Sequence, residues 1–414
     1  MITPTLTPAI NVGQNMAYRN LQAGFLFFQR LKGAFMTKKF QLLATMASGL
    51  ETLTRNELTD LGYEVTTDNG KVFFEGNYSD IARTNLWLRT ADRIKIVFGQ
   101  FKALSFEELF DQTYDLPWEN ILPMDAEFPV SGKSIKSKLY SVPNVQAIVK
   151  KAIVKRLQDT YKRRGQLPET GALYPIEVAI RNDQVQLTID TTGDSLFKRG
   201  YRISKGAAPL KENMAAALIL LTNWSKEKPF VDPMCGSGTL AIEAALIGMN
   251  VAPGLNREFV SEHWTFSDEN TWNDERQRAE EQIDYDIELN IAASDIDPHM
   301  IEIAKQNAME AGCYDQIRFK QMNVADFRTS DEDGVLVTNP PYGDRLLTEE
   351  EAHQLYKVMG IAFAPLDSWS KYILTSDLTF ESFYGQRATK KRKLYNGRIR
   401  TDYFQYWARP KRFK

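Results

Sequence analysis

The chain has 414 residues, enough for two or three domains, and its 43% hydrophobic and 25% charged residues are ordinary for a globular protein. The formal net charge is −2, no apolar run is long enough to cross a bilayer, and the N-terminus lacks the basic-then-apolar order of a secretory signal. The two cysteines, Cys235 and Cys313, exclude a disulfide framework and a zinc cluster, so we expect a cytoplasmic protein without a bound metal.

Residues 1–35 do not have the pattern of a folded domain, because Pro4 and Pro8 interrupt any early element. We expect an N-terminal extension, which is either a flexible arm or the product of an upstream start codon. A regular pattern begins at residue 36.

The next part of the chain, up to about residue 190, predicts a small α+β region. Strand-like residues and helical spacing alternate in it, and Asp68-Asn69-Gly70 forms a turn between two of the strands. The expected strands are 40–45, 63–65, 71–74, 93–98, 176–180 and 184–190, and the expected helices are 50–61, 79–88, 106–110 and 145–161.

From about residue 194 the pattern changes to alternating strands and helices. We expect strands at 229–231, 291–294, 317–322, 334–338 and 371–375, helices at 239–247, 298–311 and 350–363, and a closing hairpin of 393–395 and 401–407. This alternation predicts an α/β fold with an open, mostly parallel sheet that binds its ligands at the carboxyl ends of the strands. The hairpin would add an antiparallel edge.

Charge is segregated along the chain. Residues 131–165 hold ten Lys or Arg against Asp159, residues 387–414 hold eleven against Asp402, and residues 258–288 hold eleven acids against Arg276 and Arg278. Each basic segment could bind phosphates, or its charges could simply cover solvated helix faces. We single out as RNA-binding candidates Lys133, Lys150, Lys151, Lys155, Arg156, Arg163 and Arg164.

A glycine-rich loop lies between the strand at 229–231 and the helix that starts at Thr239. Gly236 and Gly238 allow the backbone to approach a ligand, and the helix N-terminus offers free N–H groups. The loop is neither a dinucleotide loop nor a P-loop, and its leading Asp232 would repel a pyrophosphate. That carboxylate suits a ligand with an ammonium group and no phosphate, as in S-adenosylmethionine.

Two acids follow the next strands in the order that such a cofactor requires. Asp295 could accept both ribose hydroxyls, and Asp326 is placed for the adenine amine, although either acid alone is more simply a helix cap or turn residue. Asp295 lies unusually far from the glycine loop, because the acidic segment 258–288 intervenes as an insertion. We expect Cys235 to pack in the loop rather than react. The cofactor-binding candidates are Asp232, Cys235, Gly236, Gly238, Thr239, Asp295, Ile296, Asp326 and Asn339.

Asn339-Pro340-Pro341-Tyr342 follows a buried strand and is the sharpest catalytic signal in the chain. The lone pair of an exocyclic base amine is delocalised into the ring, so the amine is a poor nucleophile. If the Asn339 side chain and the Pro340 carbonyl accept its two hydrogens, the lone pair can face a methyl donor without a strong base. Tyr342 would stack on a base extruded from the helix. The alternative is a structural proline turn with a packing tyrosine.

The segments 232–239 and 339–343, together with Ser48-Gly49-Leu50-Glu51 and residues 192–202, resemble the THUMP-domain RNA methyltransferases, above all the bacterial large-subunit ribosomal RNA guanine-N2 enzymes. The resemblance covers residues 36–414. It implies a ferredoxin-like module at 36–79, completed by later strands, a THUMP RNA-binding domain at 80–190, and a Rossmann-like class I methyltransferase domain with a seven-stranded sheet at 191–414. It also implies catalytic roles for Asn339, Pro340 and Tyr342. Some relatives carry a second methyltransferase domain, which we expect this chain to lack.

The sequence therefore predicts a methyltransferase that uses S-adenosylmethionine to form N2-methylguanine in 23S ribosomal RNA. Three alternatives remain open, namely an adenine-N6 enzyme acting on RNA or DNA, a tRNA guanine-N2 enzyme, and a non-catalytic RNA-binding factor of ribosome assembly.

Overall fold

The computed structural model describes residues 38–203, 210–265, 267–341, 347–397 and 399–408, and it contains two seven-stranded sheets. The expected extension at 1–35 and the end of the basic tail lie outside the described residues. Among the described residues, no helix is both long and apolar enough to cross a membrane.

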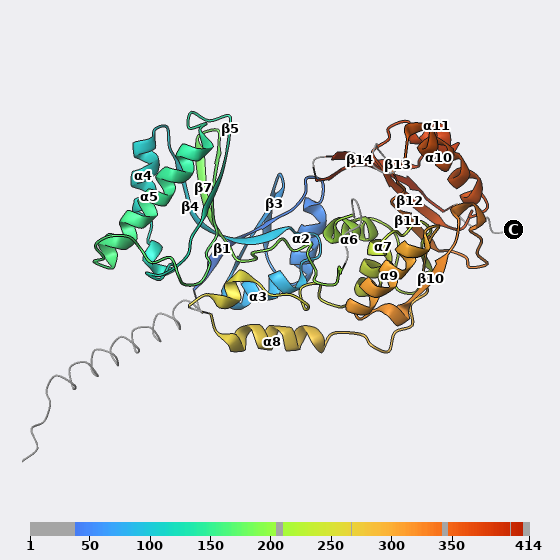
Figure 1. Ribbon diagram of the computed structural model, residues 1–414, viewed down its shortest axis with the longest axis horizontal. Coiled ribbons are helices and arrows are strands. Elements are labelled where there is room, and N and C mark those ends of the chain that lie inside the picture. The colour runs from blue at the N-terminus through green and yellow to red at the C-terminus, as the bar shows by residue number, and fades with distance from the viewer. Residues whose placement is uncertain (1–37, 204–209, 266, 342–346, 398, 409–414) are drawn as a thin grey trace, which may run out of the picture.

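The front region, from residue 38 to residue 190, is built on one sheet in the order β2-β3-β1-β4-β7-β6-β5. Every neighbouring pair is antiparallel except β5 and β6. The strands are β1 (Phe40–Thr45), β2 (Val65–Asp68), β3 (Lys71–Gly76), β4 (Arg93–Lys102), β5 (Val130–Ile135), β6 (Ile176–Arg181) and β7 (Gln184–Asp190). The helices are α2 (Glu51–Asp60), α3 (Tyr78–Trp87), α4 (Phe106–Tyr114) and α5 (Val142–Thr160), with a short 3₁₀ turn, η1 (Trp118–Asn120). Figure 1 shows α4 and α5 together beside β4, β5 and β7, and α2 and α3 nearer the centre of the molecule.

Local sequence explains where two of these helices begin. At α3, the Asn77 side chain accepts from the Asp80 N–H at 3.1 Å, and Asp80 accepts from the Asn77 N–H at 2.7 Å, which satisfies two otherwise unpaired donors. Pro143 occupies the first turn of α5, where a missing N–H costs nothing. The boundary expected between residues 79 and 80 falls inside α3, and β1 and β4 on either side of that helix pair in the same sheet.

The second sheet has the order β10-β9-β8-β11-β12-β14-β13. The first four pairings are parallel and the last two are antiparallel, as the sequence predicted for a closing hairpin. Its strands are β8 (Phe230–Asp232), β9 (Ile291–Asp295), β10 (Ile317–Gln321), β11 (Val335–Thr338), β12 (Ser370–Thr375), β13 (Lys390–Asn396) and β14 (Ile399–Tyr406). The helices are α6 (Glu212–Leu220), α7 (Thr239–Gly248), α9 (Pro298–Glu310), α10 (Glu349–Phe363) and α11 (Phe380–Tyr384), and the 3₁₀ turns are η3 (Tyr314–Gln316) and η4 (Val324–Asp326).

The two faces of this sheet have separate cores. Side chains of α10 and α11, such as Tyr356, Phe363 and Phe380, form one buried cluster with β8, β11, β12 and β14. Residues of α6, α7 and α9 belong to a second buried cluster, which continues without a break into the core of the front region. The front region and the second sheet are therefore packed into one body.

The acidic insertion packs against the front region and so connects the two regions. It lies between α7 and β9, contains η2 (Val260–His263) and α8 (Glu269–Glu280), and runs beneath α3 (Figure 1). The Tyr78 hydroxyl donates to the Ser261 carbonyl and accepts from the Trp272 indole at 2.9 Å, while Trp264 stacks on Tyr174 with ring centroids 4.8 Å apart. We call residues 258–280 the strap.

Two further contacts join the regions. In the linker that follows β7, Arg199 is buried and donates to the Arg89 carbonyl at 2.6 Å and to Glu243 of α7 at 3.4 and 3.5 Å. In the closing hairpin, Arg392 donates to the Gly49 carbonyl at 2.6 Å.

Several predicted boundaries were wrong, and four helices or strands were missed. β2 begins at Val65 rather than at residue 63, and β4 and α4 each extend four residues beyond the prediction. The missed elements are β5, α6, α8 and α11. Every residue of α6 except Leu220 is buried, so this helix has no amphipathic period that would reveal it.

Candidate active site

The glycine-rich loop connects β8 to α7 at the carboxyl edge of the second sheet. Gly236 and Gly238 have φ values of +50° and +82°, and a Cβ on Gly238 would lie 3.0 Å from the Ala304 Cβ. Gly238 thus provides both the left-handed backbone and the space that lets the loop sit against α9.

Asp232 ends β8 and is 1% exposed. One carboxylate oxygen accepts from the Thr338 hydroxyl at 3.0 Å and from the Met234 N–H at 3.3 Å. Burial raises the pKa of Asp232 to about 7, and the Thr338 hydrogen bond acts in the opposite direction. Because Thr338 is the last residue of β11, this hydrogen bond joins β8 to the strand that precedes Asn339.

Asp295 is the last residue of β9, and its side chain is hydrogen-bonded to the glycine-rich loop. It accepts from the Gly236 N–H at 2.9 Å and from the Asp297 N–H at 3.0 Å. The neighbouring Cys235 is buried, and burial raises the pKa of its thiol well above its usual range, so the thiol stays protonated and packs, as its place in the loop suggested. The loop, Asp232 and Asp295 therefore meet at one edge, as the sequence predicted.

A cavity of about 370 Å³ lies beside Asp295, between the ends of β9 and β10. Ile296, which is 64% exposed, Met322 and Asp326 line it. An apolar side chain, a thioether and a carboxylate fit an adenine ring with its exocyclic amine, and the two acids at the loop fit a ribose and an ammonium group. The residues present thus fit S-adenosylmethionine.

Asn339 follows β11 directly. All four residues of that strand are buried, and β11 lies between β8 and β12 in the middle of the sheet. The Asn339 side-chain oxygen is buried and has no hydrogen-bond partner among the described residues. Such an acceptor costs about 1–3 kcal/mol when it is left unpaired, which is a reason to expect a ligand donor there. Pro340 is buried beside it, and Tyr342 lies outside the described residues.

Sequence reasoning missed Arg202. Its guanidinium donates to Glu212 at 2.7 Å, to the Ser237 hydroxyl at 2.9 Å, to the Thr239 hydroxyl at 3.0 Å and to the Leu210 carbonyl at 3.2 Å. Thr239, expected among the cofactor residues, therefore has its hydroxyl engaged by the linker arginine. Residues 192–202 carried the family resemblance, but nothing in their spacing indicated this contact.

The candidate RNA-binding cations differ in whether a carboxylate holds them and in how exposed they are. Several are held by carboxylates, with Lys150 bonded to Glu169 at 2.6 Å and Arg156 to Glu119 at 2.5 and 2.9 Å. Lys133 pairs with Glu177 and Lys155 with Asp159, although both lysines remain about half exposed. The exposed candidates on and just after α5 are Lys151, Lys155, Arg163 and Arg164, while Val149 and Ile153 of that helix are buried as predicted.

The described residues contain no group of three or more His, Cys, Asp or Glu side chains arranged to hold a metal ion. His353 instead stacks on Phe383 with ring centroids 3.6 Å apart and lies 3.1 Å from Asp377, while the exposed His263 lies 3.4 Å from Glu258.

Three family models match the chain in succession. Residues 41–95 match an RlmL ferredoxin-like domain, residues 103–190 a THUMP domain, and residues 199–405 an RMKL-like methyltransferase domain.

Individual proteins are similar over most of the chain. A Bacillus subtilis protein described as "Putative RNA methyltransferase YpsC" is 55% identical over 91% of this chain and 99% of its own length. The "Ribosomal RNA large subunit methyltransferase K/L" of a Shewanella species is 33% identical over 86% of this chain, which spans only 51% of that relative.

Two solved structures are also close. A Listeria monocytogenes protein titled "predicted N6-adenine-specific DNA methylase" is 59% identical, with a TM-score of 0.87 over 92% of this chain and 98% of its own. SMU.472, crystallised with SAH, is 53% identical, with a TM-score of 0.86 over 92% and 100% of the two chains.

Proposed function

Since the chain belongs to the family of S-adenosylmethionine-dependent RNA methyltransferases with THUMP and RMKL-like methyltransferase domains, we propose that it methylates the N2 amine of a guanosine in 23S ribosomal RNA. The large-subunit specificity draws on the name of the K/L relatives, half of whose length this chain spans. One observation carries the chemistry, namely the buried, unpaired Asn339 oxygen beside the strand that binds Asp232.

In the proposed mechanism, the Asn339 oxygen and the Pro340 carbonyl accept the two hydrogens of the target amine. These contacts hold the amine and draw its lone pair out of conjugation with the ring, so electrostatic stabilisation replaces a strong base. Tyr342, outside the described residues, is proposed to stack on the extruded base. S-adenosylmethionine supplies the methyl group when it is bound.

The cofactor is proposed to lie along the edge formed by β8, β9 and β10. Asp232 would face its ammonium group, Asp295 its ribose hydroxyls, and Asp326 with Ile296 its adenine. The N–H groups at the start of α7 and the left-handed backbone at Gly236 and Gly238 would complete the cofactor site. No metal is part of this proposal.

We propose that residues 36–190 hold the RNA while residues 191–414 transfer the methyl group. This division places recognition and chemistry on two regions that share one core. A ribosomal RNA substrate would place the enzyme in the cytoplasm.

Mass spectrometry of nucleosides tests the proposal. Ribosomal RNA and tRNA from a deletion strain, from the same strain carrying the wild-type gene, and from one carrying Asn339→Ala are digested and compared. Loss of N2-methylguanine from 23S ribosomal RNA, restored by the wild-type gene but not by the variant, is the expected result.

The alternatives are outcomes of the same experiment. Loss of N6-methyladenine would replace the guanine proposal with the adenine-N6 activity that the Listeria relative's title names. Loss of N2-methylguanine from tRNA alone would change the substrate. Unchanged nucleosides in every sample would favour a non-catalytic role in ribosome assembly.

A further inference from the structure

One face of the front sheet is not covered by the described helices. The pairing of residues between neighbouring strands shows which side chains lie on that face. The opposite face packs on α5, whose Val145, Val149 and Ile153 are buried. Residues that pair directly across strands share a face, so each row of partners can be followed from β4 to β5. The open-face rows are Val97, Thr188, Glu177 and Ser131, then Gln100, Gln186, Ala179 and Lys133, then Lys102, Gln184, Arg181 and Ile135.

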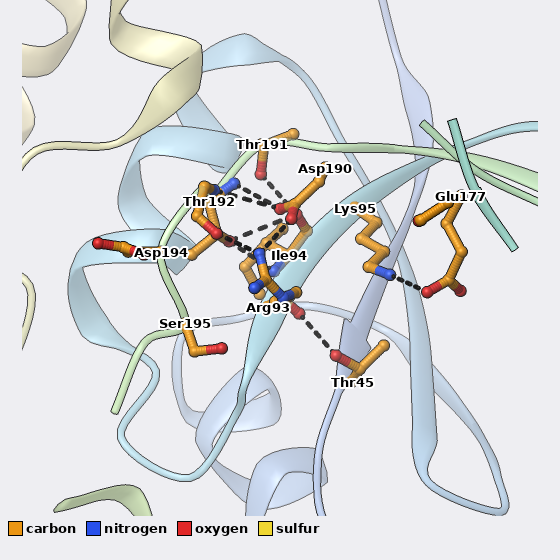
Figure 2. A network of polar contacts seen from close by, with 12 residues as sticks. Thr45, Arg93, Ile94, Lys95, Glu177, Asp190, Thr191, Thr192, Asp194 and Ser195 are labelled. Carbon is orange, nitrogen blue, oxygen red and sulfur yellow. Dashed lines mark hydrogen bonds and ion pairs between the residues drawn. The ribbon is translucent and has the colours of Figure 1, made fainter. Parts of the chain in front are cut away.

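The charges on this face are mostly positive. Lys95 precedes the first row on β4 and lies 3.1 Å from Glu177, with Lys133 on the other side of that carboxylate at 2.9 Å (Figure 2 shows the Lys95 contact). Lys71 reaches the face from β3 and donates to Gln186 at 2.6 Å. Lys102 and Arg181 flank Gln184 in the outermost row, and both are exposed.

Cations from three strands, Lys71 of β3, Lys95 of β4 and Lys133 of β5, therefore lie near Glu177. Burial lowers the pKa of Lys71, and the nearby Lys133 and Lys95 act in the same direction, while Asp68 and Glu177 act in the opposite direction. At the lower end of the face Arg93 is paired with Asp190 (Figure 2), and Asp190 and Glu258 line a cavity of about 730 Å³, so the positive excess belongs to the upper rows.

The helical side of the same region carries both paired and exposed cations, and Lys151, Arg163 and Arg164 are among the exposed ones. Lys150 and Arg156 are held by Glu169 and Glu119, and Lys155 by Asp159. The open face also has polar atoms available between its cations. The side chains of Gln184 and Gln100 are exposed there.

We propose that the upper rows of the open face, which carry Lys102, Lys133 and Arg181 with Lys71 beside them, bind the phosphate backbone of the RNA substrate. The charge of the face is complementary to a polyanion, and the small side chains of Ala179 and Ser131 let a strand of RNA approach the sheet. The inference rests on the RNA substrate of the proposed function and assigns its main contact to the sheet face rather than to α5.

Two matched triple variants test the assignment. The sheet-face variant carries Lys102→Gln, Lys133→Gln and Arg181→Gln, and the helix-face variant carries Lys151→Gln, Lys155→Gln and Arg163→Gln. Each removes two lysines and one arginine, and each breaks one exposed ion pair, so net charge and stability change alike. Affinity for an unmodified 23S ribosomal RNA transcript and for bulk tRNA is measured against salt concentration by fluorescence anisotropy.

The sheet-face variant is expected to lower the slope of log affinity against log salt by roughly 2–3, and to bind on the order of a hundredfold more weakly at about 0.1 M salt. The helix-face variant is expected to stay close to wild type. SAH affinity and melting temperature serve as controls for folding and should not change in either variant.

Equal losses of RNA affinity in the two variants would mean that overall charge alone governs binding. A larger loss of affinity in the helix-face variant would mean that α5 makes the main RNA contact. Either result overturns the proposal, as does a change of oligomeric state in the sheet-face variant with RNA affinity preserved. The test is independent of catalysis. If the wild-type protein binds RNA through this face but leaves the 23S transcript unmethylated, only the guanosine assignment fails.

Discussion

Replacing Arg202 with Ala should weaken cofactor binding without touching the reacting atoms. Arg202 does not line the cavity beside Asp295, but it donates to the hydroxyls of Ser237 and Thr239 on either side of Gly238. Its role is to hold the loop in the conformation in which a ligand can approach. We therefore treat it as a positioning residue.

The magnitude follows from burial. The side chains of Arg202 and Glu212 are 12% and 5% exposed, and breaking such a buried pair costs about 3–5 kcal/mol of unfolding free energy. The two hydroxyl contacts are worth about 1.5–3 kcal/mol each, but only the part that differs between the free and the bound loop appears in affinity. A loss of about 1.4 kcal/mol, or roughly tenfold in Kd for SAH, is a reasonable expectation.

Calorimetric titration with SAH and denaturant unfolding separate the two effects. Glu212→Gln is the matched control, because it weakens the same ion pair and leaves the loop hydroxyls bonded. Arg202→Lys should recover part of the affinity. With the cofactor varied, KM should rise in Arg202→Ala while kcat at saturation stays near wild type. A destabilised Arg202→Ala protein with unchanged SAH affinity would reduce the contact to a purely structural one.

The remaining predictions concern the cofactor, the chemistry, pH and the strap. Asp295→Ala should lose about 1.5–3 kcal/mol of SAH affinity by calorimetry, and unchanged binding would mean that the ribose assignment is wrong. Asn339→Ala should abolish methyl transfer yet bind SAH almost normally, and near-normal turnover would refute the amine contact. The pKa of Asp232 is raised to about 7, so the free energy of unfolding should fall as pH rises to about 7 and the carboxyl group ionises. SAH affinity should rise over the same pH range. Asp232→Asn should remove both pH dependences. Trp272→Ala should cost about 3–5 kcal/mol of unfolding free energy, and an unchanged denaturation midpoint would show that the strap is not part of the core.

The sequence predicted the catalytic region better than the front region. Strands that are buried on both faces, such as β11, stand out as short apolar runs, and the loop at Gly236 and Gly238 has a pattern with few other uses. In contrast, β5 has no buried residue, so its sequence shows no apolar pattern and looks only like part of a basic segment. Its strand character depends on pairing with β6, which is distant in sequence.

Side-chain partners were the least predictable feature. Lys150 and Arg156 have the same helical context as Lys151 and Lys155, but the carboxylates that hold them come from Glu169 and Glu119. The contacts of Arg202 are of the same kind, because Ser237 and Thr239 lie some 35 residues further along the chain. Periodicity reports which face a residue occupies and carries no information on such partners.

The strap, the buried Arg199 contact and the Arg392 contact join the front region to the second sheet at separate points. Three attachments prevent the rotation that a single linker would permit. On the proposed function, the distance between a phosphate bound on the front region and a base at Asn339 would then be set by the fold. On the same proposed function, the enzyme would choose its nucleotide by the distance along the folded RNA between that nucleotide and the phosphates bound on the front region.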